Sequence, residues 1–344
     1  MMSAYDIIKA ARSVSAELGP APTLAAQSLD DYRKITRKLV RDGQMNVEAT
    51  LLEAGKTRSP RTWYTRQAAL KWGARKAITQ LLTDQDRLQR QMKSAPDDVG
   101  LEKEWLKLVR WLDFYTRLVQ LMPSTCPIPK AERKRRHSKR QDLGGLPDDW
   151  RERLLGRMQK YALPFLVAAI TGCRPAELTT EVLLSIDDGE LIVCIQGAKV
   201  SKNSGQRWRE LRWTLPREGL VGLMAEKVVK AGNELRVSLD SPKNFSTAVR
   251  NAAQREWPRR EKTVTPYCLR HVFAADVKAS CLPGELIAAA LGQAVNTTAQ
   301  YYGSANQKGN TSVCPDKVAA ERTVRMRDKR AIPQRQAKVA KRFA

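Results

Sequence analysis

The stretch that organises this chain runs from Thr265 to Gly303 and reads TPYCLRHVFAADVKASCLPGELIAAALGQAVNTTAQYYG. Its apolar residues recur at helical spacing in two groups, which predicts two helices. Gly292 stands where a helix C-terminus needs a residue that tolerates a left-handed backbone. Arg270 on the first helix, and Tyr301 and Tyr302 after the second, are polar groups presented by packed helices. Such delivery of an arginine and a hydroxyl suits chemistry on an anion, although an ordinary helical hairpin is an equal interpretation.

The charge of the chain indicates a polyanionic partner. The 344 residues include 61 lysines and arginines against 36 acidic residues, a formal net charge of +25. The basic residues are spread along the whole chain rather than gathered in one face, which favours nucleic acid over a membrane surface. The competing interpretation is ordinary solvated surface charge of the kind ribosomal proteins carry.

The cysteines and histidines give little support to a metal site. Six cysteines are scattered without a C-x-x-C pair, and only two histidines are present. We therefore expect no metal and no cofactor. Isolated cysteines, no signal peptide and no apolar run of membrane-spanning length predict a soluble chain in a reducing cytoplasm.

Residues 1–123 are expected to form an all-α domain of four or five helices. The expected helices cover about 4–18, 28–42, 47–54, a long segment from Pro60, and 102–121. The helix that begins at Pro60 has a basic face, which we interpret as DNA-binding rather than merely solvated. Its members are Arg61, Arg66, Lys71 and Arg75.

Residues 124–145 are expected to be a basic linker between two domains, because prolines and glycines flank a dense run of positive charge. A nuclear-localisation-like patch is the weaker alternative. The basic residues expected to follow a phosphate backbone are Lys130, Arg133, Lys134, Arg135, Arg136, Lys139 and Arg140.

A second domain, residues 146–315, combines helices with a small sheet. Helices are expected at 148–161, 164–171, 220–231 and 243–257, and strands at 191–195 and 208–215. Residues 316–344 form a basic tail that is expected to be helical for part of its length. The fold class is therefore α+β: mainly α, with a small sheet in the second domain.

Two further motifs precede the organising stretch. In TGCRPAEL, residues 171–178, a helix ends at Gly172 and Pro175 is expected to open the next one. Glu177 then lies within reach of Arg174 and orients its guanidinium toward an anion such as phosphate. A structural ion pair is the alternative. In QGAKVSK, residues 196–202, Lys199 lies at the tip of a β-hairpin.

These motifs in this order resemble the tyrosine recombinase (phage integrase) family. The matching stretches are TGCRPAEL, QGAKVSK, TPYCLRHVFA and LGQAVNTTAQYYG, which together span the second domain. The first domain is similar to the core-binding domain of the family. The resemblance implies a two-domain, C-shaped clamp around duplex DNA. It also implies a site-specific recombinase that works as a homotetramer on paired sites, with possible accessory or directionality proteins and no membrane.

The resemblance also assigns roles. Arg174 and Arg270 would clamp the scissile phosphate, supported by Glu177, and Tyr302 would attack it to form a 3′-phosphotyrosyl intermediate. Lys199 would protonate the 5′-oxygen, with Lys202 as the alternative because the register of the hairpin tip is open. Tyr302 is favoured over its neighbour Tyr301 by its spacing of nine residues from Gln293. No metal or nucleotide is needed, because the phosphotyrosyl bond keeps the energy of the cleaved bond.

Two positions depart from the family pattern. Tyr267 stands where the family often has the histidine of H-x-x-R, and Gln293 where it has histidine or tryptophan after L-G. Both side chains can donate a hydrogen bond to phosphate, but neither supplies an imidazole with a pKa near neutrality. His271, next to Arg270, is expected to cap or pack.

The sequence therefore predicts a bacterial, nucleoid-associated DNA recombinase of a mobile element, acting in integration, excision or resolution. Two alternatives stay open. A type IB topoisomerase-like enzyme would use the same chemistry without a paired site. A non-catalytic DNA-binding regulator on the same fold is made more credible by Tyr267 and Gln293.

Overall fold

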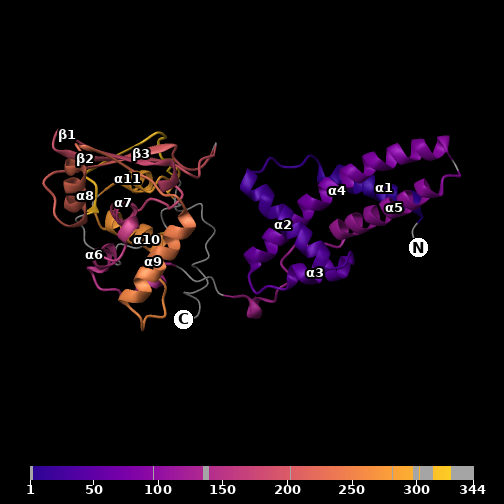
Figure 1. Cartoon of the computed structure of the whole chain (residues 1–344), viewed down its shortest axis with the longest axis horizontal. Helices are drawn as coiled ribbons and strands as arrows, with labels where there is room; N and C mark the ends of the chain where they lie inside the picture. Colours follow the sequence, from indigo (N-terminus) through magenta and orange to yellow (C-terminus); the bar gives the residue numbers. More distant parts are fainter. Residues whose placement is uncertain are drawn as a thin grey trace, which may run out of the picture. The chain divides into compact units, whose positions relative to one another are not determined.

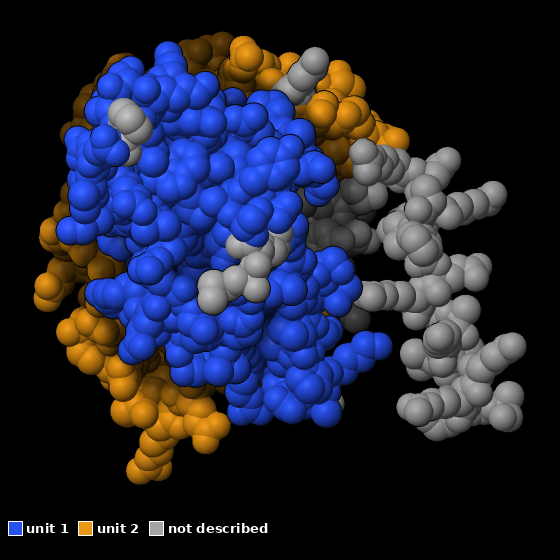
Figure 2. All heavy atoms as spheres, turned by 90° about the vertical axis from the view of Figure 1, so that its right-hand side faces the viewer, with its two compact units in different colours: residues 1–136 blue, residues 137–344 orange. Residues whose placement is uncertain are grey.

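The chain divides into two compact units, residues 1–136 and residues 137–344, coloured separately in Figure 2. The structure is a computed structural model. It describes residues 3–95, 97–134, 139–201, 203–280, 282–296, 302 and 313–326. The boundary between the units falls inside the basic segment 124–145 that the sequence singles out.

The described part of unit 1 is all-helical (Figure 1). The helices that begin at Val47, Pro60 and Val99 each have an N-cap side chain that accepts a hydrogen bond from a backbone N–H of the first turn. These N-cap residues are Asn46, Ser59 and Asp98. Pro60 sits in the first turn of the longest helix, where its missing N–H costs nothing. The helices are α1 Ala4–Leu18, α2 Ala26–Asp42, α3 Val47–Gly55, α4 Pro60–Ser94 and α5 Val99–Gln120.

Two apolar clusters hold unit 1 together along α4. One surrounds Trp63 and Leu70 with the end of α5, and the other surrounds Ile78 and Leu88 with α1. Helix α4 is therefore the axis of the unit, because its apolar stripe contacts α1, α2, α3 and α5 in turn.

Unit 2 has an antiparallel five-stranded sheet in the order β4-β1-β2-β3-β5. The strands are β1 Val182–Asp187, β2 Glu190–Gln196, β3 Trp208–Thr214, β4 Glu234–Val237 and β5 Lys317–Ala320. A row of paired aliphatic residues crosses the sheet in register: Leu235, Leu184, Val193, Leu211 and Val318. The α+β class predicted from the sequence is confirmed.

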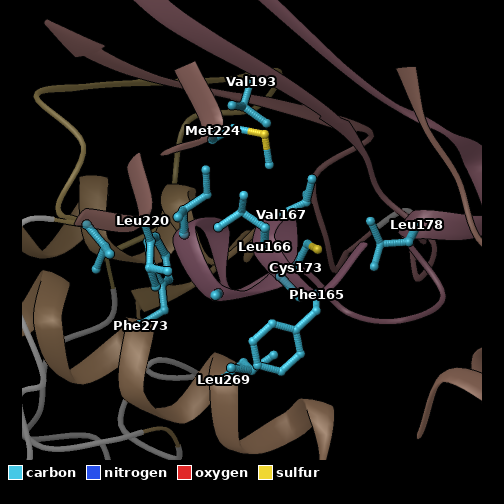
Figure 3. Close-up of a cluster of buried hydrophobic side chains, with 14 of the residues drawn as sticks. Phe165, Leu166, Val167, Cys173, Leu178, Val193, Leu220, Met224, Leu269 and Phe273 are labelled. Carbon is cyan, nitrogen blue, oxygen red and sulfur yellow. The ribbon is translucent and has the colours of Figure 1, made fainter. Parts of the chain in front are cut away.

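The helices of unit 2 gather beside its sheet (Figure 1). They are α6 Trp150–Leu155, α7 Ala162–Thr171, α8 Gly219–Lys230, α9 Pro242–Glu256, α10 Pro266–Ala279 and α11 Gly284–Ala290. Helix α7 is buried all round, from Pro164 to Thr171, because it lies between α8 and α10. Figure 3 shows Phe165, Leu166 and Val167 of α7 within the cluster that also holds Met224 of α8 and Phe273 of α10.

Unit 2 differs from the sequence-based expectations in three places. Strands β1 and β4 were not among the expected strands: β4 has only four residues, two of them charged, whereas the apolar run at 182–184 in β1 could have indicated a strand. The helix expected over 148–161 is short, ending at Leu155. In the described part of the basic tail, Lys317–Ala320 form β5 rather than a helix, and β5 pairs with β3 at an edge of the sheet that offers unpaired backbone groups. Residues 327–344 of the tail lie outside the described residues.

Gly172 makes the close approach of α7 to α10 possible. Its φ is +60°, and an added Cβ would lie 2.5 Å from Cδ1 of Phe273. We predict that Gly172→Ala destabilises unit 2 by about 2–4 kcal/mol, from left-handed strain plus overpacking. The measurement is urea unfolding of the full chain, followed by circular dichroism.

Gly189 is the matched control for this prediction. Its φ is +71° and no atom lies within 4 Å of an added Cβ. Gly189→Ala therefore carries the backbone strain alone, roughly 1 kcal/mol. Equal losses in the two variants would contradict the packing role of Gly172.

Candidate active site

The Arg174–Glu177 segment forms a closed turn after α7. The amide N–H of Glu177 donates to the carbonyl of Arg174 over 2.8 Å. The amide N–H of Arg174 in return donates to Oε2 of Glu177, also over 2.8 Å. The helix expected to open at Pro175 is absent from this turn, and only a 3₁₀ turn follows at Leu178–Thr180. Because the Glu177 carboxylate accepts the backbone N–H of Arg174, it holds this arginine in place beside the end of α7.

The Glu177 carboxylate is fully buried and is shared by two arginines. Oε1 accepts from Nη1 of Arg174, and Oε2 accepts from Nη2 of Arg209 over 2.9 Å. Burial raises the pKa of Glu177, but the charges of Arg209, Arg270 and Arg174 outweigh it and lower the pKa to about 2. Glu177 is therefore ionised at neutral pH and anchors a cluster of positive charge.

Arg209 is a member of this cluster that the sequence reading missed. It lies on β3, where alternation places Arg209, Leu211 and Trp213 on the buried face. An arginine on the buried face of an otherwise apolar strand is the signal that could have found it, since a buried charge needs a partner. Gly292 keeps room for it, because an added Cβ there would lie 2.7 Å from Nη1 of Arg209.

Arg270 on α10 is completely buried and joins the ends of two helices. Its Nη1 donates to the carbonyl of Gly172 at the end of α7 over 2.8 Å. Its Nη2 donates to the carbonyl of Leu291 at the end of α11. Helix C-termini carry partial negative charge, so they stabilise a buried guanidinium. Desolvation and then the charge of Arg174 lower the pKa of Arg270 to about 10, which keeps it protonated at neutral pH.

Tyr302 lies against Arg270. The guanidinium carbon of Arg270 is 4.8 Å from the centroid of the Tyr302 ring. Burial raises the pKa of Tyr302, but the charges of Arg270 and Arg174, with side-chain hydrogen bonds to both, lower it below its ordinary value. Residues from three separate sequence motifs therefore meet around one phenol.

The backbone and ring of Tyr302 are held by two residues of α10. Nζ of Lys278 donates to the Tyr302 carbonyl over 2.7 Å, a contact the sequence reading did not anticipate. The ring of His271 lies 5.2 Å from the Tyr302 ring, centroid to centroid. Burial, and then the nearby charges of Arg270, Arg140 and Lys278, lower the pKa of His271 to about 4. His271 is therefore neutral at pH 7.

Gln293 is buried at the L-G-Q position. Its carbonyl accepts from Nε2 of Gln206 over 3.1 Å. Neither end of its side-chain amide has a hydrogen-bond partner among the described residues, and the same is true of Nε of Arg270. Buried polar groups of this kind cost free energy until a partner arrives, so they suit a site that receives a polar ligand.

Two other residues expected in the site lie at the surface. Lys199 is exposed in the connection between β2 and β3, and no ion pair or hydrogen bond joins its side chain to the arginines among the described residues. Tyr267, in the first turn of α10, is 41% exposed. Lys202 and Tyr301 lie outside the described residues, so their expected roles stay predictions.

Two arginines of the C-terminal segment donate hydrogen bonds to the β2–β3 connection, which contains Lys199. Nη1 of Arg322 donates to the carbonyl of Ser201 over 2.8 Å, and Nη2 of Arg325 donates to that of Asn203 over 2.6 Å. Buried Gln206, at the base of the hairpin, bonds to the backbone N–H and carbonyl of Arg322 as well as to Gln293. One side chain thus links the hairpin, the L-G-Q residue and the C-terminal segment.

Several basic residues expected to bind DNA make contacts within the protein, and their role in DNA binding stays a prediction. The guanidinium of Arg66 donates to three carbonyls at the end of α3, and that of Arg75 donates to Leu18. Arg133 donates to Ile128, and Lys139 pairs with Asp142. Arg61, Lys130, Lys134 and Arg140 are exposed and Lys71 is half-buried, while Arg135 and Arg136 lie outside the described residues.

The described residues contain no group of three His, Cys, Asp or Glu side chains arranged to hold a metal ion. None of their helices is both long and apolar enough to cross a membrane.

Comparison with known proteins adds little to this geometry. No protein-family model matches the chain, and no curated protein matches it. A solved structure titled "Crystal structure of XerA recombinase" matches with 15% identity and a TM-score of 0.33, covering 87% of this chain and 93% of that one. A match at that TM-score carries no information about function.

The buried carboxylate makes unit 2 sensitive to acid. Because the folded pKa of Glu177 is about 2, below its ordinary 4.5, its contribution is present above pH 4.5 and is lost as pH falls toward 2. We predict that Glu177→Gln lowers the free energy of unfolding by about 3 kcal/mol at neutral pH and flattens its fall in acid. Urea unfolding across this pH range measures both.

Glu48→Gln is the control, since Glu48 makes an exposed ion pair with Arg117. It is expected to change the free energy of unfolding by less than about 1 kcal/mol. If the free energy of unfolding of Glu177→Gln fell in acid as steeply as that of the wild type, the low pKa of Glu177 would be contradicted.

Proposed function

We propose that this chain is a site-specific DNA recombinase that cleaves and rejoins strands through a 3′-phosphotyrosyl intermediate. The observation that carries the proposal is the meeting of Tyr302 with Arg174 and Arg270. The phenol lies beside two guanidinium groups, and its pKa is lowered by both. An oxygen nucleophile beside two fixed cations is the arrangement that attack on a phosphodiester requires.

In the proposed step, Oη of Tyr302 attacks phosphorus and loses its proton to water. The bond from phosphorus to the 5′-oxygen breaks, and that oxygen takes a proton to leave as a hydroxyl. Arg174 and Arg270 neutralise the charge that grows on the two non-bridging oxygens. Attack by a 5′-hydroxyl on the phosphotyrosyl bond reverses the step, so the number of phosphodiester bonds is conserved.

The fixed positions of the arginines support this role. Arg270 is held by the carbonyls of Gly172 and Leu291, and Arg174 by Glu177. Cations that are already oriented do not have to reorganise as charge develops, which is where electrostatic catalysis gains its advantage. Buried Gln293, with its amide unpartnered among the described residues, would donate a further hydrogen bond to the phosphate.

The remaining parts of the proposal rest on charge and on the motifs. The net charge of +25 supports a DNA partner. Unit 1 and the basic segment 124–145 would grip the duplex together with unit 2 as a clamp. Four copies would bring two sites together, with accessory proteins setting direction. Lys199, or Lys202 in its place, would protonate the 5′-oxygen.

The nucleophile can be tested with a nicked DNA substrate that carries the cognate site and loses its short 5′-fragment after cleavage. We predict that the wild-type chain forms a covalent protein–DNA adduct, visible as a band shift in denaturing gels, and that Tyr302→Phe forms none. The rate should rise with pH through a Tyr302 pKa below 10, because the phenolate is the attacking form.

Tyr161→Phe is the matched control, since the Tyr161 hydroxyl bonds to Asp240 away from the arginines. It should leave the adduct intact. Specific DNA binding by the wild-type chain without any adduct would favour a non-catalytic regulator. Relaxation of supercoils without strand exchange would favour a type IB topoisomerase-like enzyme.

The general acid can be tested separately with a substrate whose bridging 5′-oxygen is replaced by sulfur. A thiolate leaves without protonation, so a variant that lacks the acid should cleave this substrate normally. We predict that Lys199→Ala lowers cleavage of ordinary DNA by about 100-fold or more and is rescued by the sulfur substrate. Rescue of Lys202→Ala instead would transfer the role to Lys202.

A further inference from the structure

Unit 1 contains a second candidate site, a cavity of about 780 Å³. It lies between α2, α4 and α5, and its walls combine positive charge with aromatic rings. The basic and aromatic residues that line this aromatic-basic cavity are Arg33, Arg37, Arg41, Trp72, Lys76, Trp111 and Tyr115.

The basic residues that line the cavity favour an anionic ligand. Arg33, Arg37 and Arg41 follow one another at intervals of four residues, so they form one ridge along α2. No acidic residue lines the cavity. Arg41 pairs with the adjacent Asp42, whereas Arg33 and Arg37 have no ion pair or hydrogen bond within the described part of the chain. Two exposed guanidinium groups are therefore open to a ligand.

The aromatic wall selects a planar group. Trp111 stacks on Tyr115 with centroids 5.6 Å apart and an interplanar angle of 18°, which shows how flat rings pack in this wall. Trp72 meets Tyr32 edge-on, and Nζ of Lys76 lies 6.0 Å from the Trp72 centroid. Trp72 and Trp111 are half-buried, so part of each indole is open to solvent.

We propose that the aromatic-basic cavity binds an unpaired nucleotide of single-stranded DNA. The base would stack on Trp72 or Trp111, and the flanking phosphates would pair with Arg33 and Arg37. Duplex DNA does not fit this description, because its bases are stacked on one another and present no free face. An acidic peptide matches the charge but uses the rings only where it brings its own aromatic side chain. The proposal does not depend on the Tyr302 chemistry.

The probes are three DNAs of equal phosphate number: an oligo-dT strand of about 12 nucleotides, the same strand with abasic residues, and a duplex. Binding to the full chain is measured by tryptophan fluorescence and by anisotropy. We expect oligo-dT to quench the fluorescence, and the abasic strand and the duplex to do so much less. Trp72→Phe should reduce the quenching while keeping the affinity, since phenylalanine still stacks.

The decisive comparison uses two double variants that each remove two charges from α2. Arg33→Gln/Arg37→Gln changes the cavity, whereas Lys34→Gln/Lys38→Gln changes exposed residues of the same helix that do not line it. We expect the arginine variant to bind oligo-dT about tenfold more weakly than the lysine variant. Circular dichroism confirms that both remain folded.

Three outcomes would overturn the proposal. Equal losses in the two double variants would mean that α2 contributes only general electrostatic attraction. Equal quenching by the abasic strand or the duplex would mean that no base enters the cavity. Displacement of oligo-dT by a short peptide of glutamate and tyrosine, with higher affinity, would identify the cavity as a protein-docking site.

Discussion

Unit 2 depends on one buried carboxylate. Glu177 is enclosed by the protein and bonded to Arg174 and Arg209, while the charge of Arg270 acts on it as well. Three arginines this close would repel one another in a low-dielectric interior without a counter-charge. The carboxylate makes their proximity possible, and the carbonyls at the ends of α7 and α11 complete the balance for Arg270. The fold of unit 2 is arranged so that these acceptors converge.

This arginine cluster can still bind an anion, because one of its guanidinium groups is accessible. Arg174 is the most accessible of these arginines, with 15% of its side chain exposed, whereas Arg209 and Arg270 are buried. The buried pair therefore supplies field and rigidity, and Arg174 supplies the accessible contact. A phenol placed in that field becomes more acidic, which is what lowers the pKa of Tyr302 despite its burial. Burial, and after it the charges of Arg270, Arg140 and Lys278, lower the pKa of His271 to about 4, so its imidazole stays uncharged at neutral pH.

The C-terminal segment, residues 313–326, supports the same site. Strand β5 adds to the edge of β3, the strand that carries Arg209, and the residues that follow bind the hairpin of Lys199. Gln206 connects that hairpin with Gln293 and Arg322 through one buried amide. The segment after the tyrosine therefore supports the parts of the site that precede it in the chain. In unit 1, by contrast, Arg66 and Arg75 donate hydrogen bonds to backbone carbonyls at the C-terminal ends of α3 and α1.

The sequence by itself determined the helices with strong periodicity and caps, and the two-part organisation with a basic segment between the parts. Those features are local patterns, or spacings between motifs, and need no knowledge of packing. Tertiary structure alone decided the rest. Arg209 and Lys278 contact residues 32 and 24 positions away, and β5 pairs with a strand about a hundred residues earlier. The strands β4 and β5 have only four residues each, so they form only where a neighbouring strand offers its backbone groups. A buried arginine is stable only where the fold brings it a carboxylate.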